Sequence, residues 1–403
     1  MNQRTVLISG LGIAGPTLAY WLKKAGFAPT LVETAPRLRG GGYVIDFWGL
    51  GYDIAERMGL LDQINRVGYR VREMRVVDDR GRRVAGFGTG TFTELTGGRY
   101  VTLARSDLSQ LLFDTVKDTS ETIFGDEIVE LRQESDHVAV RLRQAGQRRF
   151  DLAIGTDGLH SAVRRLAFGP ESQFEKQLGY AVAAFEVRGY RPRDEDVYIM
   201  YGRPGLMLGR FTQRNDRTLF LFVFTTGIGA LPSRLDLQKA LLRERYRDAK
   251  WEVPRILDEL ERTQELYLDH VSQIRMQHWS QGRTALAGDA AFCVSLLAGQ
   301  GSALAMISAF VLAGELARAD GRYEEAFSRY EALLRSYIGA KQRGAERFAA
   351  AFAPKTRWGL YFRNQVIRTL ALPGIARFVL GKDIIDSLQL PEYDWPAATK
   401  TAA

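Results

Sequence analysis

The stretch TVLISGLGIAG, residues 5–15, decides the fold, and an apolar run over residues 17–25 follows it. A short apolar strand, a glycine-rich turn and a helix in this order are typical of the first βαβ unit of a dinucleotide-binding domain. Gly10 permits the tight turn, Gly12 lets a pyrophosphate approach the backbone, and Gly15 lets the helix pack against the strand. The amino-terminal end of the helix adds partial positive charge that faces the phosphates.

A second strand, over residues 27–32, ends in Glu33 at about the spacing from the loop that a ribose-binding acid requires. A carboxylate at this place accepts hydrogen bonds from the ribose hydroxyls and repels a 2′-phosphate, so it favours FAD or NAD over NADP. The alternative is a glycine turn beside an ordinary surface glutamate. We expect the dinucleotide to contact Gly12, Ile13, Ala14, Gly15 and Glu33.

The composition is that of a folded globular protein of 403 residues, 46% hydrophobic and 25% charged. The only cysteine, Cys293, excludes an intramolecular disulfide and a multi-cysteine metal site, and the four histidines lack metal-ligand spacing. We expect no metal centre and a cytoplasmic location, because the amino terminus also lacks the features of a secretion signal. The net charge of +8 is spread among acids along most of the chain, so we expect no nucleic-acid partner.

Two segments raise the question of a membrane. Residues 290–314 carry no charged side chain and are long enough to span a bilayer, but the small residues around Gly299-Gln300-Gly301 favour a buried helix against a cofactor. Residues 355–382 hold six cations and no acid among apolar residues. Two interpretations stay open for this second segment: a helical cover over the domain junction, or a weak contact with an anionic membrane surface.

Two further motifs lie far downstream of the glycine loop. GTDGLHSAVR at residues 155–164 follows an apolar strand, and RTALAGDAA at residues 283–291 precedes GQGS at residues 299–302. With these motifs the chain resembles, over about its first 350 residues, the class A FAD-dependent monooxygenases of the p-hydroxybenzoate hydroxylase group. This group includes salicylate hydroxylases and tetracycline-inactivating monooxygenases, and the resemblance implies FAD rather than NAD as the bound dinucleotide.

The resemblance implies an α/β fold with a three-layer Rossmann-like FAD-binding domain, an antiparallel-sheet substrate domain and a C-terminal helical segment. Alternating apolar residues independently predict antiparallel strands at residues 180–187, 197–201, 206–213 and 218–225. The expected domains are residues 1–177 and 280–350 for FAD binding, 178–279 for the substrate, and 351–403 for a C-terminal helical cover.

The resemblance also assigns FAD contacts to the downstream motifs. Asp157 shapes the FAD crevice, and Asp289 accepts hydroxyl bonds from the flavin ribityl chain. Gly301 and Ser302 begin a helix whose positive end faces the pyrimidine side of the flavin and stabilises negative charge there.

Two arginines and one carboxylate complete the expected FAD site. Arg105 heads a predicted amphipathic helix that Ser106 would cap, and in the family an arginine at this place contacts FAD; the alternative is a solvated arginine. Arg39, slightly favoured over Arg37, would contact the phosphates or a docking NADPH. Asp46, at the end of a short strand, would lie near the isoalloxazine.

The chain departs from the family pattern after Asp289. Family members usually carry a histidine and one or two prolines before the glycines, whereas Phe292, Ser295 and Leu296 stand at these places. We therefore expect a more apolar wall of different shape beside the flavin, and we assign no catalytic residue.

The sequence thus predicts an FAD-dependent monooxygenase with NADPH or NADH as co-substrate. By the resemblance, a flavin C4a-hydroperoxide hydroxylates an apolar small molecule, aromatic or polycyclic, in a monomer or homodimer. The alternatives are a flavoprotein reductase, dehydrogenase or cyclase of the same fold, or a non-catalytic FAD-binding accessory protein. Arg210 is a candidate partner for a substrate carboxylate. Alternate side chains on a strand point to opposite faces of the sheet. The substrate pocket should therefore be lined by only some of Met200, Tyr201, Met207, Phe211, Phe220, Phe222 and Phe224.

Overall fold

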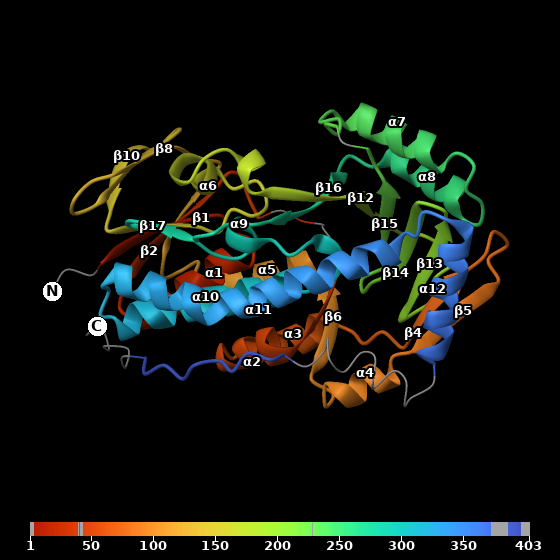
Figure 1. Cartoon of the computed structure of the whole chain (residues 1–403), viewed down its shortest axis with the longest axis horizontal. Helices are drawn as coiled ribbons and strands as arrows, with labels where there is room; N and C mark the ends of the chain where they lie inside the picture. The colour runs from red at the N-terminus through yellow and green to blue at the C-terminus, as the bar shows by residue number, and fades with distance from the viewer. Residues whose placement is uncertain (1–3, 39, 41–42, 228, 372–385, 396–403) are drawn as a thin grey trace.

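Two large sheets lie side by side along the long axis of the molecule (Figure 1). The computed structural model describes residues 4–38, 40, 43–227, 229–371 and 386–395. Long helices run beneath the first sheet and reach the second (Figure 1). The two sheets correspond to the two kinds of strand pattern in the sequence, buried parallel and alternating antiparallel.

The first sheet has six strands in the order β17-β18-β11-β1-β2-β7. Its central strand β1 is almost wholly buried and pairs in parallel with β2 and β11, as expected for a strand that is apolar on both faces. β17 runs antiparallel to β18, and the other pairs are parallel. The bounds are β1 Thr5–Ser9, β2 Ala28–Glu33, β7 Glu121–Phe124, β11 Leu152–Gly155, β17 Ser280–Gln281 and β18 Thr284–Leu286.

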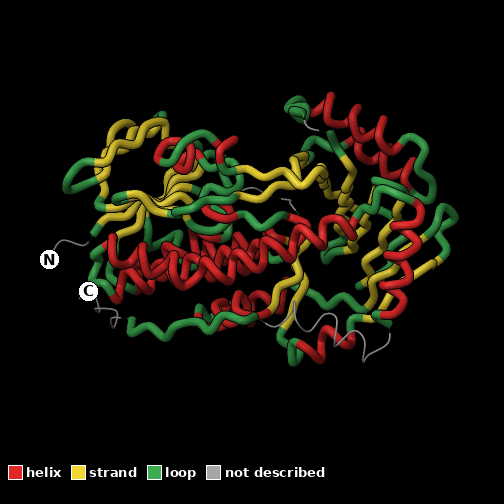
Figure 2. Tube along the Cα trace, viewed as in Figure 1, coloured by secondary structure: helices red, strands yellow, loops and turns green. Residues whose placement is uncertain are grey.

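Layers on both faces make this half of the molecule three-layered (Figure 2). Helices cover one face, and a three-stranded sheet in the order β10-β9-β8 lies on the other. The bounds are α1 Ala14–Lys24, α10 Gly301–Arg318, α11 Tyr323–Phe352, β8 Ile128–Gln133, β9 Val138–Leu142 and β10 Gly146–Phe150.

Helix α10 contains most of the long uncharged segment. Its length and mean hydropathy would suit a membrane span, but 78% of it is buried inside the fold. It contacts α1, α11 and α2 (Gly49–Arg57). The predicted buried helix is therefore confirmed.

The second sheet has seven strands in the order β16-β12-β15-β14-β13-β4-β5. β4 and β5 come from residues 73–88, far from the strands that the sequence assigned to this sheet, and β4 pairs in parallel with β13. The other pairs are antiparallel. The bounds are β4 Glu73–Val77, β5 Arg83–Gly88, β12 Glu175–Arg188, β13 Val197–Arg203, β14 Leu206–Thr212, β15 Arg217–Thr225 and β16 Tyr267–Ile274.

Helices close both faces of the second sheet. α7 (Leu235–Tyr246) and α8 (Val253–Arg262) pack on one face, where Tyr246, Leu257 and Leu260 join a buried aromatic cluster. α12 (Arg357–Thr369) contacts β5 and β13. The remaining elements are β3 Val44–Trp48, β6 Tyr100–Ala104, α3 Leu61–Val67, α4 Gly90–Leu95, α5 Arg105–Asp114, α6 Ala162–Ala167 and α9 Asp289–Phe292, with short 3-10 turns at Glu171–Gln173 and Leu296–Ala298.

Candidate functional site

The glycine loop after β1 is packed so closely that it excludes side chains. Gly10 has φ of +101°, and a Cβ there would lie 2.7 Å from the Thr156 carbonyl oxygen. A Cβ on Gly15 would lie 2.0 Å from the Gly10 carbonyl oxygen. Both glycines are therefore required by the fold, because any side chain would force the backbone apart.

Gly12 differs from these two glycines. A Cβ on Gly12 would meet only Nη2 of Arg105, at 3.0 Å, among the described atoms. The guanidinium of Arg105 also lies over the Tyr43 ring, 6.0 Å from its centroid. The loop therefore presents open backbone and a cation on the same side. Arg105 is the first residue of α5, and Ser106 does not cap this helix, because the cap position falls on Ala104 and makes no side-chain bond.

Glu33 is held at the edge of the same loop. Its Oε2 accepts a hydrogen bond from the Leu11 N–H (2.9 Å), and its Oε1 accepts from the Ala35 N–H (3.0 Å). The side chain is partly exposed at the end of β2. Its carboxylate is thus fixed beside the glycine turn while it keeps room for a ligand.

Asp157 organises the loop after β11. Its carboxylate accepts from the backbone N–H groups of Ala162 (2.8 Å) and Val163 (3.1 Å) and from the Ser161 hydroxyl. The Ser9 hydroxyl at the end of β1 donates to it at 3.4 Å. Burial raises the pKa of Asp157, and the bonds at the start of α6 oppose this rise. Asp157 therefore joins the two strand ends that border the glycine loop.

A buried arginine connects this loop to the downstream motif. Arg164 is fully buried and donates to the carbonyl oxygens of Leu159 (2.6 Å) and Ala290 (2.9 Å), and it pairs with Glu171 at 2.7 Å. Sequence reasoning missed the role of this arginine, because its place in the motif was the one local signal for it. It holds the loop after β11 against the start of α9.

His160 is more exposed than Arg164 and shares its carboxylate partner, Glu171. Its Nδ1 lies 2.9 Å from Glu171 and its Nε2 lies 2.9 Å from Asp269 on β16. The hydrogen bond to Asp269, with help from Glu171, raises the pKa of His160 to about 9 although partial burial opposes it. His160 is thus a charged bridge between the two halves of the molecule.

Asp289 brings the downstream motif to the glycine loop. Burial raises the pKa of Asp289, and the charge of Arg105 partly offsets this, which places the two groups near each other. A Cβ on Gly301 would lie 3.8 and 3.9 Å from the two Asp289 carboxylate oxygens, and a Cβ on Gly288 would lie 3.3 Å from that of Ala14.

The start of α10 lies at this same place. The helix begins at Gly301 as predicted, after Gly299, whose φ of +67° ends the preceding turn. Ser302 is buried in its first turn. The carboxylate of Asp289, the cation of Arg105 and the positive end of α10 therefore converge from three distant parts of the chain.

Asp46 lies differently from the expectation. It stands in the middle of β3 rather than at a strand end, and its Oδ1 accepts from the hydroxyls of Thr102 (2.6 Å) and Tyr198 (3.1 Å). Burial raises the pKa of Asp46. It lines a small cavity with Gly299 and Gln300, and so it still lies near the start of α10. Arg39 lies outside the described residues, and Arg37 is exposed.

Alternate side chains on the aromatic strands of the second sheet point into two different cores. Met200, Met207 and Phe211 face the side where Leu296 and Leu297 pack, next to Gly299. The opposite core, beneath α7 and α8, holds Tyr201, Phe220, Phe222 and Phe224. Arg210 is buried in ion pairs with Asp194 and Glu252, so it has no free charge for a substrate carboxylate.

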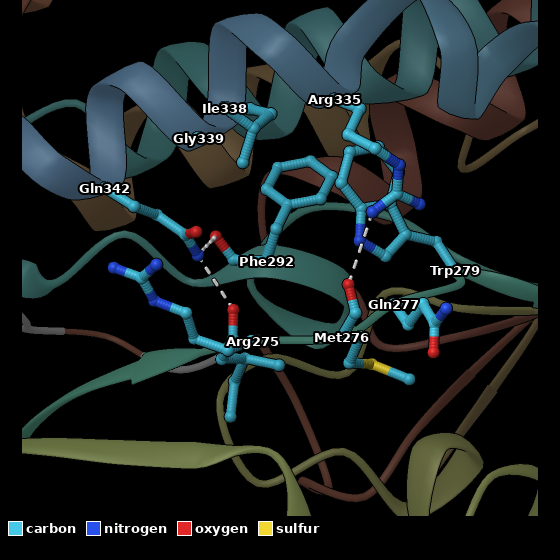
Figure 3. A pocket seen from close by; sticks show the side chains of 10 residues that line it. Arg275, Met276, Gln277, Trp279, Phe292, Arg335, Ile338, Gly339 and Gln342 are labelled. Atoms are coloured by element: carbon cyan, nitrogen blue, oxygen red, sulfur yellow. Dashed lines mark hydrogen bonds between the residues drawn. The ribbon is translucent and has the colours of Figure 1, made fainter.

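The three residues that depart from the family pattern have separate surroundings. Phe292 faces α11 and packs against Trp279, with ring centroids 4.7 Å apart. Both line a cavity of about 350 Å³ with Arg335 and Gln342 (Figure 3). Ser295 is buried with φ of +115°, which is strained for a residue with a side chain, and Leu296 packs against the second sheet.

Comparison with known proteins identifies the family. A family model described as an FAD binding domain matches residues 3–337. A flavin-dependent monooxygenase of Legionella longbeachae serogroup 1 (strain NSW150) is 32% identical over 400 residues, which cover 96% of this chain and 98% of that protein. The chain belongs to the flavin-dependent monooxygenase family. The predicted family, the fold class and FAD as the cofactor are therefore confirmed.

This flavin-dependent monooxygenase is also similar to two further proteins. An uncharacterized protein of Mycobacterium tuberculosis (strain ATCC 25618 / H37Rv) is 38% identical over 347 residues, covering 84% of this chain and 92% of that protein. The crystal structure of tetracycline destructase Tet(55) superposes with a TM-score of 0.83 at 29% identity, covering 97% of this chain and 99% of that chain.

The converging groups of this flavin-dependent monooxygenase suit FAD chemically. The backbone at Gly12 is open to a pyrophosphate, and the Arg105 guanidinium beside it complements phosphate charge. Glu33 keeps carboxylate oxygens for hydroxyl donors at the loop edge. Asp289 is half-buried, and burial raises the pKa of its carboxyl group, so hydroxyl donors from a ligand would stabilise its charged form.

Proposed function

We propose that this flavin-dependent monooxygenase hydroxylates an apolar aromatic or polycyclic small molecule, with FAD as cofactor, NADPH or NADH as electron donor and O2 as oxidant. Bound FAD would supply the redox and oxygen chemistry that the family resemblance implies. The protein supplies position, water exclusion and electrostatics. We also propose that it works in the cytoplasm, which its single cysteine favours.

One observation carries the substrate class: the face of the second sheet that meets the segment before α10 is apolar. Met200 and Met207 point to this side, and Leu297 packs there immediately before Gly299 and Gly301. Arg210, the residue that the sequence suggested for binding an anionic substrate, points to the opposite core and is engaged in a buried ion network there. An apolar, flat molecule is the ligand that such a face favours.

The chain's own residues have distinct roles in this proposal. Gly12, Ile13, Ala14 and Gly15 present backbone to the pyrophosphate while Glu33 binds the ribose. Arg105 neutralises phosphate charge, and Asp289 accepts hydroxyl bonds from the ribityl chain. Gly301 and Ser302 direct the positive end of α10 at the flavin, where it stabilises negative charge by roughly 1 kcal/mol.

The likeness to tetracycline destructase Tet(55) adds a substrate group to test. Tetracyclines are polycyclic and carry an apolar edge, so they belong in the same library as phenols and other fused-ring aromatics. We propose a polycyclic aromatic as the substrate type, because the side chains of Met200, Met207 and Leu297 make this side of the sheet apolar.

The test measures NADPH and NADH oxidation by the purified holoenzyme with each compound, with and without oxygen, followed by mass analysis of products formed under ¹⁸O2. Hydroxylation predicts substrate-stimulated, oxygen-dependent consumption and one labelled oxygen atom in the product. Anaerobic turnover with full product yield would instead identify a dehydrogenase or reductase. If neither NADPH nor NADH bleaches the bound flavin with any compound, the result would favour a non-catalytic FAD-binding accessory protein.

A matched pair of variants tests the side of the sheet on which substrate binds. Met200 and Ile199 are neighbours on β13, equally buried but in opposite cores. Truncation to alanine costs about 2–4 kcal/mol of stability at either position. We expect only Met200→Ala to change KM and the ranking of substrates. Equal changes in both variants would show that the substrate does not contact this face.

A further inference from the structure

The outward face of α12 carries an exposed aromatic cluster. Trp358 and Phe362 are 72% and 63% exposed, and Tyr361 and Val366 are exposed beside them. Seven large hydrophobic side chains are strongly exposed in the described part of the chain, and four of them are on this one helix. Single exposed apolar residues are ordinary, but a cluster of this kind marks an interaction surface.

The cluster is a stripe on a firmly seated helix. Its residues are spaced at i, i+3, i+4 and i+8, which is one face of a helix. The opposite face packs on the second sheet: a Cβ on Gly202 would meet Arg363 at 3.2 Å, and Ile367 is buried. The rings of Tyr361 and Phe362 touch, with centroids 5.9 Å apart. One face of α12 is therefore packed against the second sheet, and the opposite face exposes apolar side chains to solvent.

Positive charge surrounds the stripe. Lys355, Arg357 and Arg368 are exposed, and no ion pair joins any of them to an acid in the described ranges. The sequence from residue 347 to residue 382 contains no Asp or Glu. On the neighbouring β4–β5 hairpin, Glu73 and Asp78 are already paired with arginines.

We propose that α12 docks this protein on an anionic phospholipid surface. Trp358, Tyr361 and Phe362 enter the headgroup region, and Lys355 and Arg357 lie against lipid phosphates. Aromatic residues on one side of a helix flanked by basic residues are the combination that binds such surfaces.

Charge favours a lipid surface over a second copy of the chain. In a symmetric dimer through this face, α12 would meet its own copy. The unpaired cations of the two copies would then approach each other, which opposes association. Anionic headgroups instead compensate these cations and accept the rings.

Docking would also place the apolar side of the second sheet, where we propose that the substrate binds, close to the membrane. Ile367 on α12 belongs to the same apolar cluster as Met200 and Met207, so lipid contact at α12 brings that side near the bilayer, where apolar molecules concentrate. This consequence rests on the proposed function, whereas docking itself does not, and the test below measures binding without turnover.

The experiment is co-sedimentation of the FAD-loaded full chain with vesicles of phosphatidylcholine alone or of phosphatidylcholine with phosphatidylglycerol. We expect binding to the anionic vesicles, at least tenfold weaker binding to the neutral ones, and weakening by salt. Trp358→Ser/Phe362→Ser and Lys355→Glu/Arg357→Glu should each lower partitioning on the order of tenfold or more. Leu237→Ser, at an exposed leucine on α7, should leave it unchanged.

Retained flavin absorbance and melting temperature show that each variant folds. The proposal fails if the wild-type protein ignores anionic vesicles, or if Leu237→Ser lowers binding as much as the α12 variants do. It also fails if the wild-type protein is a dimer that Trp358→Ser/Phe362→Ser makes monomeric, because the cluster would then be a subunit interface.

Discussion

Replacing His160 with glutamine removes a charge that joins the two halves of the molecule. The imidazole lies between Glu171, after α6, and Asp269, on β16, with a distance of 2.9 Å to each carboxylate. These partners raise the pKa of His160 from 6.5 to about 9. Glutamine keeps the hydrogen-bonding capacity of one end but carries no charge at any pH.

The expected size of the effect follows from exposure. The side chain of His160 is 57% exposed, so solvent screens both ion pairs, and we expect about 1 kcal/mol in total. For a chain of this length, that is a shift in melting temperature of about 1–2 °C.

The sign of the pH dependence is fixed by linkage. The pKa of His160 is about 9 in the folded protein and 6.5 in the unfolded chain. The stabilisation that its ion pairs give the folded protein is therefore complete below about pH 6.5. It declines as pH rises and is lost above about pH 9. The stability difference between wild type and His160→Gln should therefore be largest near pH 6 and vanish near pH 10.

The assay is thermal or urea unfolding of both proteins at matched FAD concentration across this pH range, because bound cofactor itself adds stability. His278→Gln is the matched control, since His278 is 70% exposed and lies 3.6 Å from a single carboxylate. A wild-type advantage that stays constant with pH, or an equal pH-dependent loss in the control, would refute the reasoning.

Other variants test the loop and the buried ion network. Gly12→Ala, whose Cβ meets only the flexible end of Arg105, should keep the fold and lower FAD affinity at least tenfold in a flavin titration. Gly15→Ala places a Cβ 2.0 Å from the Gly10 carbonyl oxygen and should destabilise the protein by about 3 kcal/mol or more. Equal loss of stability in both would contradict this distinction. Arg210→Met leaves two carboxylates without their buried partner and should cost about 3 kcal/mol in urea unfolding, with FAD binding retained in the folded fraction.

Local patterns predicted the parts of the fold that depend on neighbouring residues. The apolar run, the glycines and Glu33 predict a strand, a turn and a second strand, because each requirement is met within a few residues. The start of α10 at Gly301 and the alternation of Met200 and Tyr201 between two cores follow in the same way. Three motifs in family order then indicated FAD.

Local patterns could not predict which strands pair when they are far apart in the sequence. The hairpin at residues 73–88 joins the second sheet through β13, and its own sequence does not indicate which strand it pairs with. Asp46 was expected at a strand end but lies within β3, because Phe47 and Trp48 continue the strand by pairing with β6. Tyr198, its hydrogen-bond partner, is 152 residues away, and only the folded chain brings the two together.

Arg164 has a consequence for anyone building chimeras of this enzyme. One guanidinium contacts the carbonyl oxygens of Leu159 and Ala290 and the carboxylate of Glu171, so two segments about 130 residues apart share a single buried cation. A graft of residues 155–164 from a relative would have to fit the host's backbone at Ala290. The two segments are therefore best exchanged together.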